Sequence, residues 1–127
     1  MDKLQFINEQ MNILAVPYEF GEWTSPVQYP YCVGEYSEET PITEDGFEQS
    51  TFIINCFNRG SEGVLLGLEE IKARIKAHFN TIYGLRAKTE EGAIAVYYGN
   101  AFPIPTNEAD LKRIQINLII KEWKGAI

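Results

Sequence analysis

The sequence has little of the chemistry that enzymes and metal sites most often use. Its 127 residues include one histidine, His78, and two cysteines, Cys32 and Cys56. The cysteines form no C-x-x-C pair, and one histidine is too few to complete a zinc site. Ser–His–Asp or Cys–His catalysis would need His78, which lies in a predicted helix where a packing or capping role is expected. We therefore expect no enzyme activity, no metal and no cofactor.

Long apolar runs are also absent. No run approaches the ~18–20 apolar residues that span a bilayer, and residues 1–5 (MDKLQ) contain no apolar signal core. Both cysteines lie in strand-like runs, which favours buried free thiols, with a cross-strand disulfide as the alternative. The apolar share of 45% and the charged share of 23% are ordinary for a globular protein. These features predict one soluble, intracellular domain over residues 1–127, with no membrane contact.

Basic residues are missing from most of the first half of the chain. The net charge is −7, and no Lys or Arg occurs between Leu4 and Asn58. The acids of that stretch are Glu9, Glu19, Glu22, Glu35, Glu38, Glu39, Glu44, Asp45 and Glu48. An acidic half and a mildly basic half could attract each other between subunits, and unevenly charged solvated surface is the alternative. In either case the chain lacks the overall positive charge typical of a nucleic-acid binder.

Two segments, residues 2–14 and 64–79, have apolar side chains three or four positions apart, as on one face of a helix. These side chains are Leu4, Ile7, Met11 and Leu14 in the first segment and Leu68, Ile71, Ile75 and Phe79 in the second. Pro17 prevents the first helix from continuing. We therefore expect a short N-terminal helix and one long helix.

Four other segments have the composition of strands: residues 31–38, 47–58, 93–98 and 113–123. The last alternates strictly, which predicts that one face carries Ile114, Ile116, Leu118 and Ile120. The connections contain proline, glycine and acidic residues and are expected to be loops. The expected fold is α+β: a mostly antiparallel sheet of about four strands, with the short N-terminal helix and the long helix packed on one face.

The order and length of these segments resemble a family of small phage and prophage proteins. The features are the helix over residues 4–14, the aromatic stretch Tyr29-Pro30-Tyr31-Cys32-Val33, the polar loop before the strand at 50–58, the helix over 65–79 and two closing strands. The family comprises tail terminator, tail completion and minor capsid (head–tail joining) proteins of long-tailed phages. No diagnostic motif accompanies the resemblance.

The resemblance implies a structural virion protein, assembled in the cytoplasm of the bacterial host. Its subunits would form a homo-oligomeric ring, possibly a hexamer, through heterologous contacts. The ring would bind the phage tail tube and head–tail connector proteins, and DNA would pass through it without specific binding. An acidic ring lumen would repel the phosphates of the passing DNA.

Three polar loops are the expected contact surfaces of such a ring: residues 40–48, 86–92 and 100–107. The predicted subunit or partner interface comprises Glu38, Glu39, Glu44, Asp45, Glu48, Arg86, Lys88, Asn100 and Asn107. One alternative is a small-ligand or regulatory protein-binding module, in which Trp23, Tyr29 and Tyr31 form an aromatic pocket. Another is an enzyme that uses Glu or Tyr as acid and base.

Overall fold

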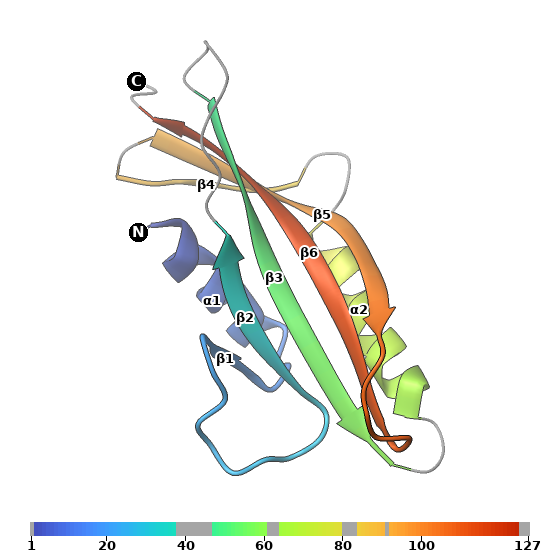
Figure 1. Cartoon of the computed structure of the whole chain (residues 1–127). Helices are drawn as coiled ribbons and strands as arrows, with labels where there is room; N and C mark the ends of the chain where they lie inside the picture. Colours follow the sequence, from blue (N-terminus) through green and yellow to red (C-terminus); the bar gives the residue numbers. More distant parts are fainter. Residues whose placement is uncertain (1, 38–46, 61–63, 80–83, 91, 125–127) are drawn as a thin grey trace.

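The computed structural model describes residues 2–37, 47–60, 64–79, 84–90 and 92–124. In chain order the elements are α1 (Lys3–Ile13), β1 (Tyr18–Phe20), β2 (Tyr31–Ser37), β3 (Phe47–Arg59), α2 (Val64–His78), β4 (Leu85–Lys88), β5 (Gly92–Ile104) and β6 (Leu111–Lys124). The strands form one sheet in the order β1-β2-β3-β6-β5-β4. β1 pairs with β2 in parallel, and the other neighbours are antiparallel. Figure 1 shows this sheet strongly twisted, with β3 and β6 as its long central strands.

Both helices contribute to a single core on one face of the sheet. Their apolar residues meet alternate strand residues, which are fully buried because side chains along a strand point to opposite faces. The main members are Phe6, Ile7 and Met11 from α1, Leu68, Ile71 and Ile75 from α2, and Phe52, Ile54, Ile114, Ile116, Leu118 and Ile120 from the strands. This burial, rather than any local propensity, holds the helices against the sheet.

Polar contacts connect the two helices to each other and to the sheet. His78, at the end of α2, hydrogen-bonds Gln10 of α1 at 2.8 Å. Arg74 donates to the Leu14 carbonyl just after α1. At the other end of α1 the Lys3 ammonium lies 3.0 Å from the Glu122 carboxylate of β6. His78 thus connects the end of α2 to α1, and its predicted packing or capping role stays a prediction.

The predicted four-stranded antiparallel sheet with one long helix is wrong. The sheet has six strands and is mixed, and the two helices are both short, at 11 and 15 residues. The two missed strands are the edge strands β1 and β4, of three and four residues, which lie in segments that resemble loops. Strands this short have no period of their own and are defined only by their pairing with β2 and β5.

β5 also extends further along the sequence than predicted. It continues through Asn100 and Pro103 to Ile104, where the sequence indicates a loop. Pro103 is opposite Ile114 of β6, beyond the four residues that pair with β4. There β5 is an edge strand in the described structure, so a residue without an amide hydrogen is tolerated.

Other element predictions are confirmed. The helix expected over residues 64–79 is α2, and the strands expected at 31–38, 47–58 and 113–123 are β2, β3 and β6. Cys32 and Cys56 are buried free thiols, opposite each other across β2 and β3 with their Sγ atoms 2.6 Å apart. The hydrogen bond to Cys32, together with burial, raises the pKa of the Cys56 thiol well above its usual value.

Candidate interaction surface

The face of the sheet opposite the helices is the candidate functional site. We call it the open face. In β3 it presents Thr51, Ile53, Asn55 and Phe57, and in β6 it presents Arg113, Gln115, Asn117, Ile119 and Lys121. These side chains alternate with the core residues, and most are half-buried. In Figure 1 α2 lies behind β5 and β6, so the two faces of the same strands have different surroundings.

Aromatic rings gather at one end of the open face. Tyr31 of β2 contacts the rings of Trp23, Tyr29 and Phe57, with centroid distances of 4.8, 5.5 and 5.0 Å. Burial raises the pKa of Tyr31, and nearby Tyr29 adds to the shift. The structure therefore brings together the three aromatics that the sequence grouped. Their rings pack on one another, and the two hollows described below are lined by other residues.

Two arginines extend this aromatic cluster. The Arg113 guanidinium lies 5.4 Å from the centre of the Phe57 ring and donates to Asn55 Oδ1 at 2.8 and 3.2 Å. The Arg59 guanidinium lies 5.5 Å from the centre of the Tyr29 ring. Both stack on aromatic faces, which suits a planar delocalised cation.

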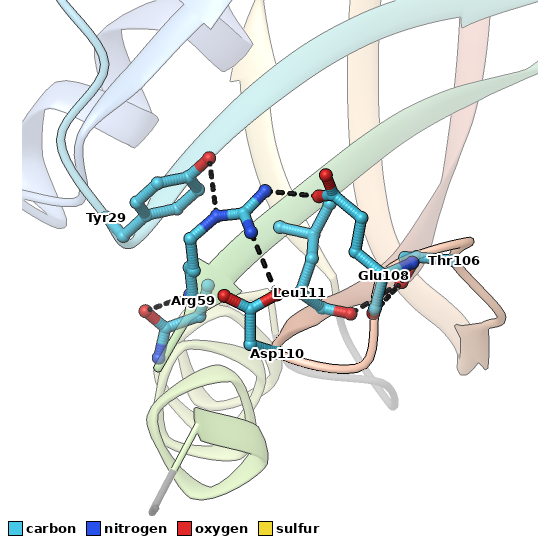
Figure 2. Close-up of polar contacts among 7 residues, drawn as sticks. Tyr29, Arg59, Thr106, Glu108, Asp110 and Leu111 are labelled. Atoms are coloured by element: carbon cyan, nitrogen blue, oxygen red, sulfur yellow. Dashed lines mark hydrogen bonds and ion pairs between the residues drawn. The ribbon is translucent and has the colours of Figure 1, made fainter. Parts of the chain in front are cut away.

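Arg59 also connects three segments that are distant in the sequence, as Figure 2 shows. Its Nε donates to the Tyr29 hydroxyl at 3.3 Å, Nη1 to Asp110 at 2.9 Å, and Nη2 to Glu108. These hydrogen bonds, that to Tyr29 first, raise the pKa of the Arg59 guanidinium. Thr106 holds the turn that carries both carboxylates through bonds to the Glu108 and Leu111 carbonyls, at 2.8 and 2.6 Å. These contacts of Arg59 are exposed and hold the β5–β6 turn against the end of β3.

Neutral amides occupy the middle of the open face. Asn117 donates to Asn100 at 2.8 Å and accepts from Gln115 at 3.1 Å. Beside them is a shallow hollow of about 360 Å³, lined by Gln49, Thr51, Gly99, Asn100, Asn117 and Ile119. A β-bulge between Tyr98 and Asn100 bends β5 there. This central region offers hydrogen-bond donors and acceptors but no charge.

The edge of the open face at β4 is basic. Arg86 and Lys88 are exposed, and the register of β4, β5 and β6 puts them on the same face as Lys121 and Trp123. A hollow of about 590 Å³ lies there, lined by Arg86, Ala87, Lys88, Ala93, Ile94 and Trp123. Lys121 lies over the Tyr97 ring, 5.3 Å from its centre.

The opposite edge, at β1 and β2, is acidic. Glu35 of β2 and Glu22, which follows β1, are exposed. The Gly21 amide donates to the Gly34 carbonyl at 2.8 Å, which extends the pairing of this segment with β2 beyond Phe20. Glu19 of β1 accepts from Thr24 Oγ1 at 2.8 Å and from the Thr24 and Ser25 amides, and these bonds lower its pKa. The described β1–β2 edge therefore carries exposed acids, and the β4 edge combines Arg86 and Lys88 with the exposed Glu90 that follows β4.

The predicted interface residues that the structure describes are spread over different parts of the sheet. Glu38, Glu39, Glu44 and Asp45 lie outside the described residues. Arg86 and Lys88 are on β4, Asn100 is on β5, and Asn107 is exposed in the β5–β6 turn at the other end of the molecule. Glu48 is in β3, opposite Glu122 on the side of α1. Four of the residues placed in loops therefore belong to strands, and their interface role stays a prediction.

Sequence reasoning missed Arg59 and its acidic partners, and it grouped Tyr29 only with the other aromatic residues. Tyr29, Glu108 and Asp110 lie 30 to 51 positions from Arg59, so no local pattern connects them. The available signal was that Arg59 is the first base after a long acidic stretch. The described residues contain no group of three or more His, Cys, Asp or Glu placed to bind a metal ion. None of the helices in the described part of the chain has the length and apolarity needed to cross a membrane.

Comparisons with known proteins show a shared fold and no family. No protein-family model and no curated protein sequence matches this chain. Five chains of solved structures match. One of them, whose name states no activity, is 18% identical, with a TM-score of 0.61 over 85% of this chain and 79% of that chain. At this identity the similarity shows the fold alone.

Proposed function

We propose that this chain is a structural subunit of a long-tailed phage or prophage, in a ring at the junction between head and tail. The role is that of a tail terminator or tail completion protein, which binds the end of the tail tube and the head–tail connector. The proposal assigns no catalytic residue. The observation that carries it is the open face, which spans six strands and groups aromatic rings and an arginine at one end.

The side chains of this surface support association. No described helix or strand covers the open face. Antiparallel sheets commonly leave one face in water, so the support for a partner comes from the kinds of side chain on this face. The face combines aromatic rings and arginines at one end with amides in the middle, and Tyr, Trp and Arg are enriched in protein interfaces. The order and length of the elements add the resemblance to phage head–tail proteins.

The decisive experiment measures assembly with and without tail tubes. We expect native mass spectrometry of the purified chain to show a closed oligomer, with six copies as the first expectation, and negative-stain microscopy to show a ring. Because charged contacts weaken as salt screens them, the oligomer should loosen between 50 and 500 mM NaCl, conditions chosen to span a Debye length from roughly 14 to 4 Å.

The second arm uses tail tubes from the phage or prophage that encodes the chain. Rings should bind at one end of each tube and stop its elongation, which microscopy would show as tubes of uniform length. A chain that stays monomeric at high concentration and leaves tube ends bare would contradict the proposal. Saturable binding of a small molecule by such a monomer would instead support the ligand-binding alternative.

A further inference from the structure

Cys32 of β2 and Cys56 of β3 form a pair of thiols that the proposed function does not use. They are opposite each other in the strand register, both are completely buried, and their Sγ atoms are 2.6 Å apart. We infer that this pair is a redox site, which a small-molecule disulfide such as oxidised glutathione converts into a cross-strand disulfide between β2 and β3. The inference depends on the fold alone and holds whether or not the chain is a phage protein.

The backbone hydrogen bonds of β2 show why a disulfide fits here. The Cys32 amide donates to the Pro17 carbonyl at 2.8 Å, so it faces the β1 side of the strand. The amide and carbonyl of one strand residue point to the same side, which makes Cys32 and Cys56 a non-hydrogen-bonded pair of the antiparallel ladder. The Cα atoms of such pairs are about 4.5 Å apart, within the range that disulfides span. The bond can therefore form with little movement of the backbone.

The reaction is a thiol–disulfide exchange in two steps. The thiolate of one cysteine attacks a sulfur of the small disulfide, forms a mixed disulfide and releases one small thiolate. The thiolate of the other cysteine then attacks the protein sulfur of the mixed disulfide and releases the second small thiolate. The two protons of the cysteine thiols pass to the released thiolates. The protein thus loses two hydrogen atoms and two electrons, and the small disulfide is reduced to two thiols.

Burial makes this exchange slow while the sheet is closed. A small disulfide cannot reach the two buried sulfurs, and the raised pKa of Cys56 leaves little of its reactive thiolate. The cysteines lie near a sheet edge, however, where β1 covers β2 over only three residues. Edges of this kind open locally at a lower free energy than the whole domain unfolds. We therefore expect the opening of the β1–β2 edge to set the rate of oxidation.

The disulfide would stabilise the part of the sheet that opens. It joins positions 24 residues apart, which removes conformational freedom from the unfolded chain and should raise the melting temperature by about 10 °C. It would also hold β2 against β3 and so slow the local opening. In a reducing compartment the pair stays as two thiols, and transfer to an oxidising environment adds the covalent link.

The test incubates the purified full chain with equal concentrations of reduced and oxidised glutathione, with and without urea below the unfolding transition. Intact-mass spectrometry should show the loss of two hydrogen atoms, and urea should accelerate it because the edge then opens more often. The oxidised chain should melt about 10 °C higher than the reduced chain, and the β2 amides should exchange hydrogen more slowly. The matched controls Cys32→Ala and Cys56→Ala each retain one thiol, so the oxidant should not raise their melting temperatures.

Three results would overturn the redox site. The first is a chain that keeps both thiols even in urea, and the second is a final product that carries glutathione on its cysteines. The third is a cross-strand disulfide that leaves the melting temperature unchanged or lower. Assembly is measured separately under reducing conditions. A chain that then forms no ring would contradict the proposed function and leave the redox site intact.

Discussion

β3 and β6 carry two faces of opposite character on the same backbone. On the helix side Ile54, Ile116 and Leu118 are completely buried. On the open side their neighbours Gln115 and Asn117 are half-buried and hydrogen-bonded to each other. Side chains along a strand point alternately to its two faces. A single stretch of β3 or β6 therefore supplies both core residues and surface residues. The stabilising burial is therefore concentrated on the helix side, and substitutions on the open face are expected to leave the protein folded.

The largest expected loss of stability comes from the core face, and two neighbouring isoleucines allow a comparison of the core face with the open face. Ile54→Ala removes a buried side chain from the core and should lower the free energy of unfolding by about 2–5 kcal/mol. Ile53→Ala, on the open face, should cost about 1 kcal/mol, because that side chain is half-buried. Urea unfolding followed by circular dichroism measures both. Equal losses would mean that the open face is also packed against something that stabilises the fold.

Gly34→Ala is expected to cause the next largest loss of stability. A Cβ there would lie 2.7 Å from Phe52 Cζ and 2.9 Å from Tyr18 Cε1, so it overpacks the helix side of β2. The expected loss in unfolding free energy is about 1–3 kcal/mol. Tyr18→Phe alone should cost about 1 kcal/mol, since the Tyr18 hydroxyl donates to Asn8 at 2.6 Å. Combining the two should cost less than their sum, because Tyr18→Phe removes the hydroxyl that lies nearest to the added Cβ, and strict additivity would show that this hydroxyl does not obstruct the new methyl group.

A smaller effect concerns the ion pair between Lys3 and Glu122. Burial lowers the pKa of Lys3, but hydrogen bonds to Tyr36 and Glu122 outweigh it and raise the pKa above the usual 10.5. A raised lysine pKa stabilises the fold below the unfolded value, and the contribution disappears as pH rises through the folded value. Lys3→Met should therefore cost about 0.5–1 kcal/mol at pH 8 and progressively less above pH 10.5. A cost that is the same at pH 8 and above pH 10.5 would assign the effect to packing of the Lys3 side chain.

The smallest effect on stability is expected in the amide region of the open face. Asn117→Ala removes the bonds to Asn100 and Gln115, yet the free energy of unfolding should change by no more than about 0.5 kcal/mol, as for most surface substitutions. Oligomer dissociation, measured by native mass spectrometry at several concentrations, should shift more than the unfolding midpoint does. If only stability changes, the amides belong to the fold and not to an interface.

The parts of the fold that were predictable follow from local periodicity. The helix spacing of Leu68, Ile71 and Ile75 and the alternation in β6 both depend on residues a few positions apart, and the structure buries both sets. In the site, Trp23, Tyr29 and Tyr31 were grouped correctly because they lie within nine positions of one another. Arg59 was not predicted, since its partners meet it only after β3 and the β5–β6 turn have been brought together.

The amino-acid sequence by itself determined the helix faces, the apolar face of β6 and the separation of acidic from basic residues along the chain. Only the tertiary structure decided that β1 and β4 are strands, because three or four residues become a strand only when a neighbour supplies their hydrogen bonds. The same strand order converts a charge difference along the chain into a charge difference across the sheet. It puts Glu35 of β2 and Lys88 of β4 toward opposite edges of one face.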